Sequence, residues 1–167
     1  MSQLRVLIPS ELLKTRVQEL GKEIRQNYGS GPITCICVLR GALFFAADLV
    51  RYIGGDIRVE FIHINNQSDS MGIDISYFSG DIAGKDCILI EDIVETGLTL
   101  QTLYAYLDDQ NPRSLHSVSL LDKPSTRHHS IAIDFIGFSI PDEFVVGYGL
   151  DLHGRHRALD YIATYIP

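Results

Sequence analysis

One stretch, residues 87–100, constrains the fold of this chain more than any other. It contains an apolar run, Ile88–Ile90, that predicts a buried strand. Two adjacent carboxylates, Glu91 and Asp92, stand where that strand would end. A turn of small residues follows at 95–99, and apolar residues then recur with helical spacing. The stretch therefore predicts a strand, a tight polar turn and the N-terminus of a helix.

The turn between this strand and helix has the features of an anion site. The first N–H groups of a helix lack internal partners and its dipole is positive there, so a phosphate fits. Thr96 and Thr99 can donate from their hydroxyls, and Gly97 has no Cβ to block close backbone approach. Glu91 and Asp92 would repel phosphate unless they accept from sugar hydroxyls or hold magnesium. An ordinary strand-to-helix connection with solvated acids is the alternative.

Length, charge and cysteine usage narrow the class of protein. A chain of 167 residues is expected to form one domain, residues 1–167, and its net charge of −7 argues against a nucleic-acid partner. The apolar stretch Ala42–Ala47 ends at Asp48, and neither a membrane-spanning segment nor a signal peptide is expected. Three cysteines in strand-like surroundings predict reduced thiols and a cytoplasmic location. Cys35 and Cys37 are expected in the core, because their spacing suits neither zinc nor redox chemistry.

The remaining pattern predicts strands and helices that alternate. Ser10 is expected to cap a helix that runs to about Tyr28 and stops at Gly29. Ile33–Leu39 has no polar alternation, so both faces of this strand are expected to be covered, and a helix follows at about 42–52. Further strands are expected at Arg58–Ile64, Ile73–Phe78, Ser114–Leu121, Ile131–Phe135, the beginning of Phe144–Asp151, and Tyr161–Ile166. The polar run Asn65–Gly72 is expected to be a mobile surface loop.

Three further segments carry polar groups beside strand ends. Leu39-Arg40-Gly41 forms a second strand–loop–helix unit, although such an arginine alone is more often a surface charge. Lys123 follows a strand, where most lysines are solvated. The segment Arg127-His128-His129 could be interpreted as a metal-binding site. Adjacent histidines rarely bind one ion, however, and a solvated turn is the better interpretation. Phe144–Asp151 alone reads as an edge strand with a glycine-rich turn, and Arg157 follows.

Taken together, these blocks resemble the phosphoribosyltransferase family. Its signature is a hydrophobic strand, two acids, two hydrophobic residues, Asp-Thr-Gly and a threonine, and the match at 87–100 is close. The segments Leu39–Gly41, Lys123 and Phe144–Asp151 resemble the hypoxanthine–guanine branch, so the resemblance covers nearly the whole chain. It implies an α/β fold, the type I phosphoribosyltransferase fold, with a central, mainly parallel twisted sheet flanked by helices and a small base-binding hood.

The resemblance also implies a role for each block. Glu91 and Asp92 would bind the ribose hydroxyls and, with Asp151, help hold Mg²⁺. The implied 5′-phosphate cradle is Glu95, Thr96, Gly97, Leu98 and Thr99. The implied pyrophosphate site is Leu39, Arg40, Gly41 and Arg157. In the family, the loop that corresponds to Leu39–Gly41 often has a cis peptide before its basic residue. The implied purine site is Lys123, Phe144, Val145 and Asp151. The family's flexible lid corresponds to Ser70, Met71 and Gly72, where Met71 replaces the usual tyrosine.

The implied reaction joins hypoxanthine or guanine with phosphoribosyl pyrophosphate and releases pyrophosphate. Lys123 would donate to the 6-oxo group, which favours a carbonyl over the amino group of adenine. Glu95 stands where the family has its proposed general base, an aspartate, and is expected to accept the proton from purine N7. The resemblance implies a homotetramer or homodimer. Two alternatives are a non-catalytic regulator of the same fold that binds nucleotide or RNA, and an enzyme acting on xanthine or a pyrimidine.

Overall fold

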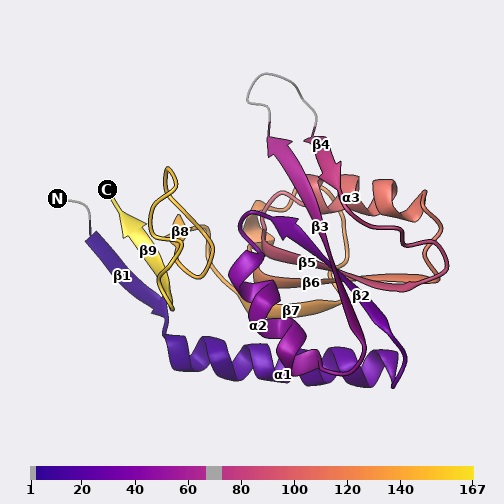
Figure 1. Cartoon of the computed structure of the whole chain (residues 1–167). Coiled ribbons are helices and arrows are strands. Elements are labelled where there is room, and N and C mark those ends of the chain that lie inside the picture. The colour runs from indigo at the N-terminus through magenta and orange to yellow at the C-terminus, as the bar shows by residue number, and fades with distance from the viewer. Residues whose placement is uncertain (1–2, 67–72) are drawn as a thin grey trace.

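The computed structural model describes residues 3–66 and 73–167 as an α/β structure with two sheets (Figure 1). In chain order the elements are β1 (Gln3–Ile8), α1 (Ser10–Tyr28), β2 (Ile33–Leu39), α2 (Leu43–Ile53), β3 (Ile57–Asn66), β4 (Ile73–Phe78), β5 (Asp86–Val94), α3 (Leu98–Asp108), β6 (Ser114–Asp122), the 3-10 turn η1 (Pro124–Thr126), β7 (Phe135–Ser139), β8 (Val145–Val146) and β9 (Ile162–Ile166). The larger sheet has the order β4-β3-β2-β5-β6-β7, and β4 alone among its strands runs antiparallel to its neighbour.

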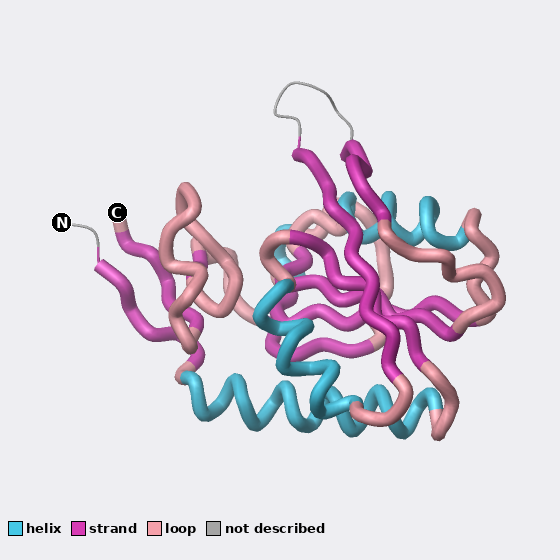
Figure 2. Tube along the Cα trace, viewed as in Figure 1, coloured by secondary structure: helices cyan, strands magenta, loops and turns pink. Residues whose placement is uncertain are grey.

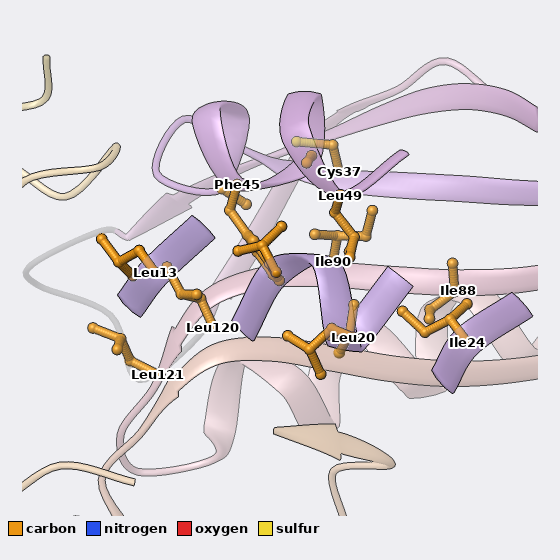
Figure 3. Packing of buried hydrophobic residues seen from close by; sticks show 14 of the residues in the cluster. Leu13, Leu20, Ile24, Cys37, Phe45, Leu49, Ile88, Ile90, Leu120 and Leu121 are labelled. Atoms are coloured by element: carbon orange, nitrogen blue, oxygen red, sulfur yellow. The ribbon is translucent and has the colours of Figure 1, made fainter. Parts of the chain in front are cut away.

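The central strands are apolar on both faces because helices cover both faces of the larger sheet. One core cluster joins α1 and α2 to one face, and Figure 3 shows Leu20 and Phe45 from these helices packed with Ile90 of β5. The other cluster packs Leu103 of α3 against the opposite face, which includes Leu89. Six of the seven residues of β2 are buried, as its continuous apolar run predicts.

The smaller sheet, β1-β9-β8, is antiparallel and lies to one side of the larger sheet (Figure 1). It brings the two ends of the chain together, since β1 pairs with β9. This sheet provides a platform beside the carboxyl edge of the larger sheet, in the place of the expected hood. Strands β3 and β4 extend beyond the other strands of the larger sheet, toward the top of the view (Figure 2).

Most expected elements are confirmed, and three details are wrong. Helix α1 spans the expected residues, but Pro9 rather than Ser10 is its N-cap, and no side chain caps it. The expected strand Ile131–Phe135 is irregular up to Asp134, whose carboxylate accepts from the Ser117 N–H at 2.7 Å and so takes part in side-chain bonding instead of a ladder. Strand β1 was not expected, because most of its residues are exposed and give no periodic signal.

The order of the strands reverses between β2 and β5. From β2 the chain proceeds to β3 on one side, whereas from β5 it proceeds to β6 and β7 on the other side. In open α/β sheets a crevice forms at the carboxyl edge where the direction changes, and ligands bind there. The loops that follow β2 and β5 are Arg40-Gly41 and Glu95–Gly97, so the two segments singled out from the sequence meet at this switch point.

Within the described part of the chain, no helix is long and apolar enough to cross a membrane. Cys35, Cys37 and Cys87 are free and buried in the sheet, which confirms their expected core positions. Burial raises the pKa of the Cys35 and Cys37 thiols to about 12, so both stay protonated at neutral pH.

Candidate active site

A cleft of about 720 Å³ opens at the switch point. Its walls combine the loops after β2 and β5 with Arg157 from the C-terminal segment. Eleven of the residues singled out from the sequence line it, namely Leu39, Arg40, Gly41, Glu91, Asp92, Glu95, Thr96, Gly97, Leu98, Thr99 and Arg157. The cleft also includes His63 and Ile73, which carry no motif in the sequence and were missed, and Asn65, which was expected in a mobile loop but lies in β3.

Glu91 and Asp92 lie within β5, which continues two residues beyond them to Val94 instead of ending at these acids as expected. Glu91 is buried, and its Oε2 atom has no hydrogen-bond partner among the described residues. Burial, and then the charge of Asp92, hold the pKa of Glu91 well above its usual range. Burial also raises the pKa of Asp92 to about 6, although Asp92 Oδ1 accepts from the Ile93 N–H at 3.0 Å. Within the described part of the chain, Asp92 is therefore partly compensated by the Ile93 N–H and by the charge of Arg157, whereas Glu91 Oε2 is left without a donor.

The acids of the cleft suit a divalent ion that is shared with a ligand. Among residues 3–66 and 73–167, no group of three His, Cys, Asp or Glu side chains converges as a protein-only metal cage. A hard cation such as magnesium commonly takes only one or two carboxylates and completes its shell with water and substrate phosphates. The unpartnered oxygen of Glu91 and the carboxylate of Asp92 fit that open arrangement. Asp151 lies nearby and pairs with Arg157, with 2.6 Å between Oδ1 and Nη2.

The turn 95–99 has the geometry expected of an anion cradle. Gly97 has φ +87° and immediately precedes α3, so the first turn of this helix, whose N–H groups have no partners within the helix, lines the cleft. A Cβ on Gly97 would lie 2.8 Å from the His129 carbonyl oxygen, and only glycine fits both requirements. Thr96 Oγ1 accepts from the Leu98 N–H at 3.3 Å, which leaves its own hydrogen free to donate.

The loop after β2 packs directly against the acid pair. The Leu39–Arg40 peptide is cis, as in the loops that the sequence resembles. An ideal Cβ on Gly41 would lie 1.6 Å from Asp92 Oδ2, so the backbone approaches this carboxylate as closely as a glycine allows. Gly149 in turn packs on the Gly41 carbonyl, and Arg157 Nη1 donates to the Gly149 carbonyl at 2.5 Å. The two loops interlock and place the cations Arg40 and Arg157 on one cleft.

Lys123 lies beyond the end of β6, next to β5. Its N–H donates to the Val94 carbonyl at 2.9 Å, and its side chain is only 4% exposed. The ammonium pairs with Glu95, with 2.5 Å from Nζ to Oε1, and lies 3.6 Å from Asp142 Oδ1. Asp142 carries no motif that the sequence would flag, and its proximity to Lys123 was missed.

The residues of the expected purine site, Lys123 included, are not among those that line the cleft. Phe144 is half exposed and makes an edge-on contact with Tyr165, with 6.3 Å between ring centroids. Val145 is buried in β8. The lid residues Ser70, Met71 and Gly72 lie outside the described residues.

The interpretation of residues 127–129 as a solvated turn is wrong for Arg127. Its Nε donates to the Glu95 carbonyl at 3.0 Å, and its guanidinium forms an ion pair with Asp122. The N–H groups of His128 and His129 donate to the Thr96 carbonyl at 3.0 and 2.9 Å. Residues 127–129 therefore hold the backbone carbonyls of the anion cradle in place, a contact that could not be predicted from the sequence.

Comparisons with known proteins agree with this geometry. Residues 9–153 match the family model of the phosphoribosyl transferase domain. The chain is 39% identical to hypoxanthine phosphoribosyltransferase of Escherichia coli (strain K12), over 96% of this chain and 94% of that protein. It is 38% identical to hypoxanthine-guanine phosphoribosyltransferase of Mycobacterium avium, over 97% of this chain and 85% of that protein.

Comparison with a solved structure also indicates the phosphoribosyltransferase fold. The crystal structure of a hypoxanthine-guanine phosphoribosyltransferase from Bacillus anthracis superposes with a TM-score of 0.95. It is 35% identical in sequence, and the match covers 98% of this chain and all of that chain. From its sequence, its fold and the arrangement of its cleft, the chain belongs to the phosphoribosyltransferase family.

Proposed function

We propose that this protein transfers the 5-phosphoribosyl group from phosphoribosyl pyrophosphate to hypoxanthine, guanine or both. The products are the nucleoside monophosphate and pyrophosphate, and the physiological role is purine salvage. One observation carries the proposal: an anion cradle, a buried acid pair and two arginines line a single cleft, and a buried lysine lies at the next strand end. The relatives described above are named as enzymes that act on these purines, which favours catalysis over the regulator.

The proposed contacts follow from the chemistry of each wall. The turn 95–99 holds the 5′-phosphate with helix N–H groups and threonine hydroxyls. Arg40 and Arg157 hold the pyrophosphate, since planar guanidinium groups bind phosphate oxygens in pairs. Glu91 and Asp92 accept from the ribose hydroxyls, which gives the unpartnered Glu91 oxygen a donor.

At the base end, Lys123 donates to the 6-oxo group while Phe144 stacks on the ring and the Val145 backbone reads its edge. Asp151 lies on the same side of the proposed site and forms an ion pair with Arg157. Glu95 accepts the proton from purine N7 as the new bond to the ribose forms. The transition state resembles a ribosyl oxocarbenium ion, so positioning and exclusion of water contribute most of the rate.

Phosphoribosyltransferases work with a divalent metal ion, and we propose Mg²⁺ for this chain. Glu91, Asp92 and Asp151 are the residues that would hold it, directly or through water. When bound, Mg²⁺ would neutralise the diphosphate charge that these carboxylates otherwise repel.

We also propose a cytoplasmic homodimer or homotetramer. The free, buried and protonated cysteines suit a reducing compartment. Exposed Leu43 and Phe44 at the beginning of α2 provide apolar surface for a subunit contact. Light scattering on a size-exclusion column measures the assembly, and a monomer at all concentrations would contradict it.

The function is tested by nucleotide formation from phosphoribosyl pyrophosphate with each base offered separately in the presence of Mg²⁺. We expect turnover with hypoxanthine or guanine and little with adenine or uracil. Turnover with xanthine or uracil as the best substrate would replace the proposed substrate class. A folded protein that binds phosphoribosyl pyrophosphate but turns over no base would favour the regulator.

A further inference from the structure

The ammonium of Lys123 is enclosed between two carboxylates that come from different parts of the chain. Glu95 lies in the loop after β5 and Asp142 lies between β7 and β8, yet Nζ is 2.5 Å from one and 3.6 Å from the other. The lysine side chain is 4% exposed, whereas the side chains of Glu95 and Asp142 are 51% and 67% exposed. A nearly buried cation is thus paired with two acids that are themselves largely exposed to solvent.

Base binding, as proposed above, places two demands on Glu95 that conflict with this arrangement. Its carboxylate is required at purine N7, and the Nζ donor that it occupies is required by the 6-oxo group. Glu95 also lines the cleft, so its carboxylate lies between the cleft and the lysine. A purine therefore has to separate Glu95 from Lys123 before it can use either group.

Separation leaves a nearly buried ammonium without its nearest counter-ion. Breaking a buried ion pair from one side is costly, because the remaining charge is no longer compensated. A purine carbonyl is neutral and supplies only one acceptor for the three donors of an ammonium. Asp142 is the second carboxylate within 4.0 Å of Nζ, and its exposure leaves it free to move the remaining distance.

We propose that Asp142 is a positioning residue for base recognition, which takes over as the counter-ion of Lys123 when the purine displaces Glu95. This inference rests on the proposed function and names a residue that sets its specificity. With Asp142 in place, the ammonium of Lys123 keeps a counter-ion and one donor aimed at the 6-oxo group. Asp142 does not touch the purine; it acts through the lysine.

The test compares steady-state kinetics of the whole protein with those of Asp142→Asn. The KM for hypoxanthine or guanine should rise by about three- to tenfold, as expected for loss of one partly exposed charge partner. The KM for phosphoribosyl pyrophosphate, kcat and the thermal midpoint should change by little, because the ion pair of Asp142 is with Lys123, not with the phosphate-binding N–H groups, and its side chain is mostly exposed. Asp142→Glu, which keeps the charge, should recover much of the base affinity.

Glu143→Gln is the matched control. It makes the same acid-to-amide change at the next residue, but Glu143 bonds Arg5 and Thr164 instead of Lys123. Its KM for the base should stay near the wild-type value. An unchanged base KM in Asp142→Asn would overturn the inference, and so would parallel rises in both KM values together with a lower thermal midpoint, which indicate a structural role.

A double-mutant cycle then identifies the route of the effect. If Asp142 acts through Lys123, adding Asp142→Asn to Lys123→Met should leave kcat/KM for the base at the value of Lys123→Met alone. Additive losses would overturn the inference. Wild-type protein that turns over no 6-oxopurine would instead refute the proposed function and this inference with it, an outcome distinct from active protein with an unaffected Asp142 variant.

Discussion

Glu95 has two roles in the proposed reaction, as the partner of Lys123 and as the proton acceptor. It stands where the family pattern has aspartate, and its additional methylene lets the carboxylate reach Lys123 Nζ at 2.5 Å. The same side chain lines the cleft at the head of the anion cradle. In the proposed reaction, the glutamate side chain is long enough to form an ion pair with Lys123 and to rotate toward N7 of a bound purine.

Replacing Glu95 with Gln should lower kcat by about a hundredfold or more, because an amide cannot accept the N7 proton. Glu95→Asp retains a carboxylate and should remain active, which makes it the control. Both variants should bind phosphoribosyl pyrophosphate with a KM near that of the wild type, since the cradle uses backbone N–H groups. Single-turnover rates at saturating substrates measure the effect, and an unchanged rate in Glu95→Gln would show that proton acceptance is not its role.

Gly41 is the residue whose substitution the cleft should tolerate least. Its missing Cβ is occupied by Asp92 Oδ2, 1.6 Å from the ideal position, so Gly41→Ala must displace the carboxylate or the loop that carries Arg40. Displacements of about 1 Å can cost a hundredfold in rate, and we expect a loss of that order in kcat/KM for phosphoribosyl pyrophosphate. Gly31→Ala is the matched control, because nothing lies within 4 Å of its Cβ. Equal activity in the two variants would contradict the packing argument.

At the scale of the elements, the sequence predicts what is locally encoded. The strands β2 and β5 are recognisable because continuous apolar runs are needed where helices cover both faces. Strand β1 escapes prediction because its pairing with β9 joins residues about 160 positions apart and leaves most of its side chains exposed. Residues within a sequence motif can be recognised from the sequence. The ion pairs of Arg127 and Asp142 could not be predicted, because they form only when the fold brings separate segments together.

The edge of the sheet opposite the cleft is held by side chains that should respond to pH. Asp86 at the beginning of β5 accepts from Arg113 Nε and from Ser114 Oγ, each at 2.8 Å, and so ties β5 to β6. Its hydrogen bonds, that with Arg113 first, hold the pKa of Asp86 below its usual value. A lowered folded-state pKa means that the stabilisation is complete above the unfolded pKa of about 3.9 and is lost as the pH falls through the folded value.

Asp86→Asn should therefore lower the free energy of unfolding at pH 7 by on the order of 1 kcal/mol. The difference from the wild type should shrink as the pH falls below about 4. Urea denaturation at several pH values measures both quantities. Asp109→Asn, at the end of α3, provides an exposed acid-to-amide control without this tie. A difference that is constant down to pH 2 would contradict the charge-based account.

At the scale of the whole molecule, topology and charge act together. The switch between β2 and β5 brings the two loops to one edge, and the segment 147–157 closes over them through Gly149 and Arg157. We propose that residues 1–167 form one domain, since β1 and β9 pair at the two ends of the chain. The net charge of −7 and the buried acid pair should disfavour binding of a diphosphate that carries no metal ion.

Binding of phosphoribosyl pyrophosphate should consequently depend on a divalent ion, and folding stability should report it. A ligand that binds only the folded state at 100 times its Kd adds about 2.7 kcal/mol to the free energy of unfolding. We expect the thermal midpoint to rise with phosphoribosyl pyrophosphate and MgCl₂ together, and to rise little with MgCl₂ alone or with phosphoribosyl pyrophosphate and EDTA. Gly31→Ala should show the full rise, and Gly41→Ala a reduced one, because it disturbs Asp92. An equal rise with EDTA would mean that the arginines and the cradle suffice and that the acids serve the ribose hydroxyls alone.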